Sequence, residues 1–187
     1  MIKVIKKDEY HTSMWSGGST TEMFIYPEKS SYKNKDFLFR ISSATVKEEK
    51  TVFTKLEGIK REIVLLEGDM SLAHDGVEKV LLMPYEPYIF EGGQNTTSKG
   101  KAIDFNLMYQ GCRVSLEVIN KDVMRTEPKV NDMHFFYSKD NDFEIENLNT
   151  NICVNSGDLV FMQGEKKRFE IKGRGKNQRI IYIRICV

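Results

Sequence analysis

The chain has little cysteine, no long apolar run and no excess of charge of either sign. Its three cysteines, Cys112, Cys153 and Cys186, form no Cys-x-x-Cys pair, which argues against a zinc ribbon or a disulfide framework and favours reduced thiols. A formal net charge of +1 argues against a broad surface for nucleic acid or an anionic membrane. No segment resembles a transmembrane helix or a signal peptide. We therefore expect a cytoplasmic protein with neither nucleic acid nor membrane as partner.

Histidine is also scarce. His11, His74 and His134 lie far apart in the sequence, whereas a catalytic metal site needs about three converging protein ligands. Neither a Gly-x-Ser-x-Gly turn nor a cysteine with a nearby histidine marks a nucleophile. We therefore expect no metal site and no cofactor, and we expect each histidine to be structural or exposed.

What the chain does contain is a succession of short segments rich in Val, Ile, Phe and Tyr. Turn residues such as Gly68-Asp69 and Gly92-Gly93 separate them, and no stretch keeps a helical period. The expected strands are Met23–Tyr26, Phe37–Thr45, Glu62–Leu66, Val80–Met83, Tyr88–Phe90, Ile103–Tyr109, Val114–Ile119, His134–Tyr137, Phe143–Ile145, Leu159–Met162, Arg168–Ile171 and Ile180–Val187. This pattern predicts an all-β fold of the sandwich or barrel type.

A weak repeat suggests two related β modules. Leu65–Leu72 and Val154–Phe161 both run through a Gly-Asp turn, about 90 residues apart. The modules would be residues 1–120 and 121–187, joined by the charged segment 121–131, with a single sandwich as the alternative. The basic clusters at 166–168 and 173–176 are expected to be solvated turns.

The two ends of the chain are apolar. Met1–Ile5 and Ile180–Val187 have the character of strands, so they could close the modules internally or pair in a homodimer.

Polar residues interrupt two of the expected strands. If Ile103–Tyr109 is a strand, Asp104 and Asn106 share the face opposite the core, which is either solvent or the lining of a pocket. Arg40 shares a face with Ser42, and a buried guanidinium there would need a partner, for which Asp104 is a candidate. An arginine held in this way presents two parallel N–H donors to a planar anion. Arg61 is either at a pocket mouth or a surface base lying over the strand.

The single tryptophan precedes two glycines. Gly17 and Gly18 allow a tight turn or a close approach of the backbone to a ligand. Trp15 is then either the apolar wall of a loop that closes a pocket or the anchor of an N-terminal arm.

Six motifs in order, over roughly residues 10 to 110, resemble the HutD/Ves family. They are Trp15-x-Gly17-Gly18-x-Thr20, Phe37-x-x-Arg40-Ile41-Ser42-x-Ala44, Phe53-Thr54-x-x-x-Gly58-x-x-Arg61, Leu66-x-Gly68, Phe90-x-Gly92 and Asp104-Phe105-Asn106-x-Met108. The resemblance implies a bicupin, in which two small cupin-like jelly-roll barrels pack together without the histidine metal motif of enzymatic cupins. In such a fold, N-terminal strands can swap into the second barrel.

The resemblance also implies a ligand. The family is tied to histidine utilisation and is thought to bind a small acid such as urocanate or a formyl- or formimino-glutamate, with no established catalysis. Arg40, Arg61, Asp104 and Asn106 match its motif positions and would line the pocket of the first barrel, and Trp15 and Ser42 would complete it.

Four positions depart from the family pattern: Phe39, Lys60, Gly93 and Gln110 stand where Trp, Asp, an acid and Arg are usual. Since rim charges set which anion is preferred, they bear on the ligand. The expected function is non-catalytic binding of a small carboxylate with a regulatory or buffering role. The alternatives are a metal-independent cupin isomerase or hydrolase with Asp104 as acid/base, and a structural or stress-related protein.

Overall fold

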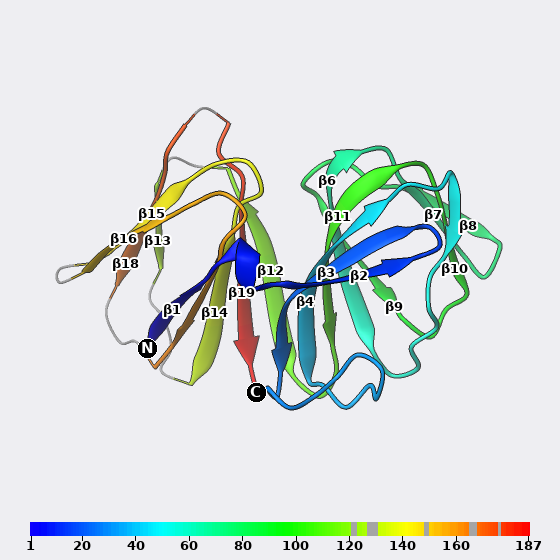
Figure 1. Ribbon diagram of the computed structural model, residues 1–187, viewed down its shortest axis with the longest axis horizontal. Coiled ribbons are helices and arrows are strands. Elements are labelled where there is room, and N and C mark those ends of the chain that lie inside the picture. Colours follow the sequence, from blue (N-terminus) through cyan, green and yellow to red (C-terminus); the bar gives the residue numbers. More distant parts are fainter. Residues whose placement is uncertain (121–122, 127–130, 148–149, 165–167, 176) are drawn as a thin grey trace. The chain divides into compact units, whose positions relative to one another are not determined.

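The computed structural model confirms an all-β chain (Figure 1). It describes residues 1–120, 123–126, 131–147, 150–164, 168–175 and 177–187. Within these ranges there is one 3-10 turn, Lys7–Glu9, and no α-helix. Accordingly, no helix among the described residues is long and apolar enough to cross a membrane.

The contacts divide the chain into two compact units. The N-terminal unit is Tyr10–Gly111, and the C-terminal unit combines Met1–Glu9 with Cys112–Val187. The division thus falls at residue 111 rather than at 120, because the strand Arg113–Ile119 pairs along its whole length with Ile180–Cys186. Parts of the segments 121–131, 166–168 and 173–176, which we expected to be a linker and basic turns, lie outside the described residues.

The N-terminal unit contains two antiparallel sheets. The first has the order β2-β3-β4-β11-β6-β9 and consists of β2 His11–Trp15, β3 Gly18–Tyr26, β4 Phe39–Val46, β11 Ala102–Tyr109, β6 Lys60–Gly68 and β9 Pro87–Glu91. The second has the order β5-β10-β7-β8 and consists of β5 Lys50–Val52, β10 Thr96–Lys99, β7 Ser71–His74 and β8 Glu78–Leu81.

The C-terminal unit also has two antiparallel sheets. The first has the order β1-β17-β14-β19-β12 and consists of β1 Ile2–Ile5, β17 Leu159–Gln163, β14 Asp132–Tyr137, β19 Ile180–Cys186 and β12 Arg113–Ile119. The second has the order β13-β18-β15-β16 and consists of β13 Val123–Thr126, β18 Phe169–Gly173, β15 Phe143–Asn147 and β16 Thr150–Val154.

The same pairing order occurs in both units. β4-β11-β6-β9 corresponds to β12-β19-β14-β17, and β5-β10-β7-β8 corresponds to β13-β18-β15-β16. The eight successive strands β4 to β11 therefore match β12 to β19 one by one. The Gly-Asp turns noted in the sequence are not equivalent positions in this scheme, since one joins β6 to β7 and the other joins β16 to β17.

Each unit buries an apolar core between its two sheets. In the N-terminal unit Ile63 and Leu65 of β6 pack with Leu72 of β7, and in the C-terminal unit Phe136 and Tyr182 belong to the same cluster as residues of β15 and β18. Alternation of side chains along each strand explains this arrangement, because every second residue faces the opposite sheet. Toward one end of the strands, polar residues continue these inner faces: Arg40, Ser42 and Arg61 in the N-terminal unit, and Arg113, Ser115 and Asp132 in the C-terminal unit.

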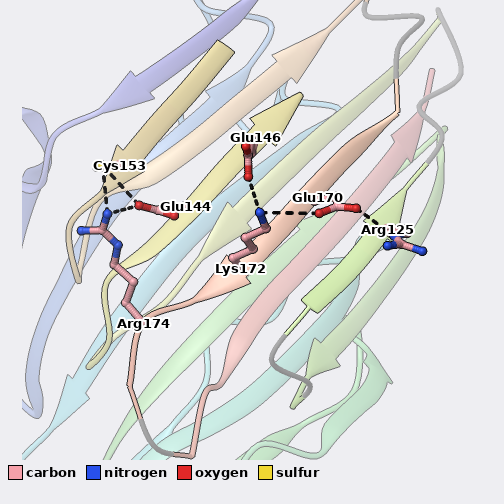
Figure 2. Close-up of polar contacts among 7 residues, drawn as sticks. All are labelled: Arg125, Glu144, Glu146, Cys153, Glu170, Lys172 and Arg174. Atoms are coloured by element: carbon pink, nitrogen blue, oxygen red, sulfur yellow. Dashed lines mark hydrogen bonds and ion pairs between the residues drawn. The ribbon is translucent and has the colours of Figure 1, made fainter. Parts of the chain in front are cut away.

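Charged side chains cover the outer face of the sheet β13-β18-β15-β16 (Figure 2). Lys172 contacts Glu146 and Glu170, Arg125 binds Glu170, and Arg174 contacts Glu144 and the thiol of Cys153. Solvent screens cross-strand pairs of opposite charge at such exposed positions, so they stabilise the sheet only weakly. Their side chains are partly to largely exposed, so this face is solvated.

Candidate functional site

A cavity of about 310 Å³ opens on the inner face of the sheet β2-β3-β4-β11-β6-β9. The strand register places Met108 of β11 between Arg40 of β4 and Arg61 of β6, and Asn106 opposite Ser42. The lining residues are Ser13, Met14, Trp15, Thr20, Tyr32, Arg40, Ser42, Ala44, Val46, Thr51, Val52, Phe53, Thr54, Arg61, Asp104, Asn106 and Met108. All six residues predicted for the site, Trp15, Arg40, Ser42, Arg61, Asp104 and Asn106, therefore line one cavity.

Arg40 is held by a carboxylate, but not by the one the sequence suggested. Its Nε donates to Glu22 Oε2 at 2.6 Å, and its NH1 group donates to Ser42 Oγ at 3.1 Å. The Tyr32 ring lies under the guanidinium, with Cζ 4.7 Å from the ring centroid. Glu22 can reach Arg40 because β3 pairs directly with β4, whereas Asp104 is deeper along β11.

Arg61 is 6% exposed and lies against two aromatic rings. Its Cζ is 4.5 Å from the Phe53 ring centroid and 5.3 Å from that of Phe90, which are cation–π distances. Burial lowers the pKa of Arg61 to about 10, so the guanidinium stays charged at neutral pH. Its Nε has no hydrogen-bond acceptor among the described residues. The structure excludes the interpretation of Arg61 as a surface base.

Asp104 and Asn106 lie on an interior strand and are buried, with Asp104 only 1% exposed. Asp104 and Asn106 therefore face the cavity rather than solvent. Burial raises the pKa of Asp104 to about 7, against the opposing effects of the Arg61 charge and a backbone hydrogen bond from Ala44. Asp104 Oδ1 and Asn106 Oδ1 have no partner among the described residues, and buried polar atoms of this kind carry a free-energy cost unless something binds them.

Trp15 lies at the end of β2, in a hairpin with β3. Its side chain is 38% exposed, lines the cavity and donates from Nε1 to Thr20 Oγ1 at 3.2 Å. Neighbouring atoms lie so close to Gly17 and Gly18 that neither position has room for a side chain. A Cβ on Gly17 would lie 2.1 Å from the Trp15 ring, and one on Gly18 would lie 1.9 Å from the Thr45 carbonyl oxygen. The Gly-Gly pair thus seats the indole at the wall of the cavity.

Sequence reasoning missed three residues that shape the site. Glu22 orients Arg40, while Tyr32 and Phe53 each face a guanidinium. Phe53 belongs to one of the motifs quoted above, but nothing in the sequence singles out Tyr32 or Glu22.

The residues that depart from the family pattern do not line the cavity. Phe39 stacks on Phe24 and Tyr26 across the other face of the sheet, and Lys60 pairs with Glu91. Gln110 donates from Nε2 to the Phe37 carbonyl at 2.7 Å. Alternation turns Lys60 away from Arg61, so its charge is not part of the cavity lining.

The histidines lie outside this cavity. His74 is buried between Thr96 Oγ1 and the Tyr88 hydroxyl, His134 binds the Tyr182 hydroxyl, and His11 is exposed. Within the described ranges, no three His, Cys, Asp or Glu side chains converge as metal ligands.

Chemically, the site combines two guanidiniums with a carboxyl group that titrates near neutral pH and a carboxamide. One unsatisfied donor, Arg61 Nε, accompanies two unsatisfied oxygens. A ligand that satisfies all three must carry both an acceptor and a donor.

Comparison with known proteins agrees with this architecture. PA5104 from Pseudomonas aeruginosa PAO1, a conserved protein of unknown function, matches with 20% identity and a TM-score of 0.86 over 100% of both chains. HutD from Pseudomonas fluorescens SBW25, in a formate condition, matches with 24% identity and a TM-score of 0.78 over 100% of this chain and 98% of that one. The Escherichia coli pirin YhhW in complex with nickel(II) matches with 10% identity and a TM-score of 0.71 over 98% of each.

These likenesses establish an all-β fold with cupin-like neighbours. No curated protein matches the chain. The HutD family model, however, matches residues 7–180 and so spans nearly the whole sequence. The chain belongs to the HutD family.

Proposed function

We propose that this protein binds a small carboxylate that also carries an N–H donor, and that it acts as a sensor or buffer rather than as a catalyst. The observation that carries the proposal is the set of unsatisfied buried atoms, Arg61 Nε, Asp104 Oδ1 and Asn106 Oδ1, around one cavity. Leaving such groups unpaired costs about 1–3 kcal/mol each, and a bound ligand recovers that free energy.

The ligand's carboxylate would accept from Arg61 and from Arg40, which Glu22 and Ser42 hold in place. Its N–H group would donate to Asp104 Oδ1 or Asn106 Oδ1. Trp15 would cover the apolar part of the molecule. A cavity of about 310 Å³ suits a small metabolite.

Membership in the HutD family supports an association with histidine utilisation. Urocanate and the formyl- and formimino-glutamates each combine a carboxylate with an N–H group, so they meet the donor and acceptor requirement. The proposal includes a bicupin organisation, with the site in the first cupin-like module, a cytoplasmic location and a homodimer as the assembly to test.

A thermal-shift screen tests the ligand class. At a hundred times its dissociation constant, a ligand adds about 2.7 kcal/mol to the free energy of unfolding, which raises the melting temperature by a few degrees. We expect urocanate or N-formylglutamate to produce this shift, and glutarate, which lacks the N–H donor, to produce less. Because Trp15 is the single tryptophan, its fluorescence should change with the same ligand.

The matched control for this screen is Arg125→Ala, which removes an exposed arginine that lies in the C-terminal unit. It should keep the full shift, whereas Arg40→Ala should lose it. No shift with any small acid, or an equal shift in Arg40→Ala, would refute the proposed site.

A second candidate is a metal-independent isomerase or hydrolase, favoured by one observation: Asp104 has a pKa of about 7, which suits an acid/base. Incubating the protein with the acid that binds, and following the acid by proton NMR, separates the two functions. Binding without conversion is expected. Conversion that disappears in Asp104→Asn while binding persists would replace the binding function with the enzymatic one.

A further inference from the structure

The C-terminal unit contains a cavity of its own, of about 270 Å³. Its lining residues are Arg113, Val114, Ser115, Asp132, Arg184 and Cys186. They come from β12, β19 and β14, the three strands that correspond in pairing order to β4, β11 and β6. The second cavity therefore lies at the counterpart of the first.

The register strengthens this correspondence. Cys186 pairs with Arg113 on one side and with Asp132 on the other, and Arg184 pairs with Ser115. The Arg-x-Ser pattern of β12 repeats that of Arg40 and Ser42 on β4. On these two corresponding strands an arginine and a serine two residues later thus face the inner side of the sheet.

The charges differ from those of the first cavity. Arg184 donates from Nε to Asp132 Oδ2 at 2.5 Å, and Asp132 is only 3% exposed. The Arg184 side chain makes no other hydrogen bond with the described residues, so its terminal nitrogens are available. Arg113 donates to Cys186 Sγ at 3.4 Å. Two guanidiniums and one carboxylate give the lining a formal charge of +1.

We propose that this second cavity is a binding site for a small oxyanion, a carboxylate or a phosphate. The buried Asp132 binds Arg184 through Nε and so fixes its orientation. The terminal nitrogens of the guanidinium then remain for an anion. Arg113 supplies a second cation and Ser115 a hydroxyl donor. Because the lining carboxylate is already paired, the ligand needs no N–H donor, which distinguishes this site from the first.

Cys186 provides a local readout, since an anion seated between Arg113 and Arg184 lies over its thiol. The experiment measures alkylation of Cys186 by iodoacetamide, followed by peptide mass analysis, in chloride, acetate or phosphate at one ionic strength. At ten times the dissociation constant the unliganded fraction, and with it the rate, should fall about tenfold. Comparing acetate with phosphate identifies the preferred oxyanion.

Cys153 is the internal control in the same digest. It also contacts an arginine, Arg174, but it is exposed and lies on another sheet (Figure 2). Its alkylation rate should not change with the anion. Equal slowing at Cys153 and Cys186 would show an effect of the medium and overturn the proposal.

Two variants connect the protection to the site. Arg113→Gln alters an exposed side chain, so it should fold normally and lose most of the protection, whereas Arg125→Gln should keep it. Amide NMR shifts of Ser115 and Arg184 upon anion addition give a second readout that does not depend on the thiol. Absence of both protection and shifts with either anion, or full protection in Arg113→Gln, would disprove the site.

Discussion

Replacing Arg61 with alanine is expected to weaken ligand binding on the order of 100-fold or more. Truncating one partner of a buried charged pair costs about 2–5 kcal/mol, and every 1.4 kcal/mol corresponds to a tenfold change in affinity. Arg61 is buried, charged and unsatisfied at Nε, so under the proposed function its Nε–H is free to donate to the ligand. Titration of wild type and Arg61→Ala with the acid found by the thermal-shift screen measures the effect.

The adjacent lysine offers a control matched in charge and position. Lys60 is on the same strand, but its side chain faces away and pairs with Glu91, so Lys60→Ala should bind normally. Arg61→Ala should also remain folded, because the lost side chain leaves no hydrogen-bond partner behind at Nε. Equal affinity of a folded Arg61→Ala variant and the wild type would remove Arg61 from the site.

Replacing Asp104 with asparagine is expected to stabilise the unliganded protein strongly at pH 8 and much less at pH 5. The pKa of Asp104 is about 7 in the folded state and near 3.8 when unfolded, so the folded state binds the extra proton between these values. The wild type therefore loses stability as the pH rises from about 4 to 7, on the order of 4 kcal/mol for this group. Asparagine has no such proton, so urea unfolding at both pH values should separate the two proteins.

Glu62, whose pKa burial also raises to about 7, contributes a similar pH dependence to both proteins and cancels in their difference. Asp140→Asn serves as the control, since its exposed carboxylate is already solvated. If the free energies of unfolding of the wild type and Asp104→Asn changed in parallel over this pH range, burial would impose little free-energy cost on ionised Asp104. The acid/base candidate would then lose its support as well.

The set of six site residues came from the resemblance to the HutD/Ves family, while alternation along strands grouped four of them by face. In a strand over Ile103–Tyr109, Asp104 and Asn106 share a face, and the same alternation puts Arg40 on one face with Ser42. Most apolar strands were also predicted, within a few residues of their bounds. Short polar strands such as β5 and β10 were missed, because Lys50–Val52 and Thr96–Lys99 carry no apolar period.

What the sequence could not provide is which strands become neighbours. Arg40 binds Glu22 because β3 lies beside β4, and a register shift between Glu22 and Phe24 sets that pairing. The identity of the neighbour depends on the assembled sheet rather than on local pattern. For the same reason the counterpart cavity was missed, although Arg113 and Ser115 repeat the spacing of Arg40 and Ser42.

The strand β1 has a consequence for the order in which the chain assembles. Ile2–Ile5 pairs with Leu159–Met162, and the N-terminal amine binds the Gln163 carbonyl at 2.7 Å. β1 therefore has to wait for a partner that is made much later in the chain, while Tyr10–Gly111 contains partners for all its own strands. Pairings so remote in sequence form slowly, and domains fold as units during translation. Tyr10–Gly111 can thus fold before Cys112–Val187 is made, and β1, which precedes it in the chain, completes the unit that follows it.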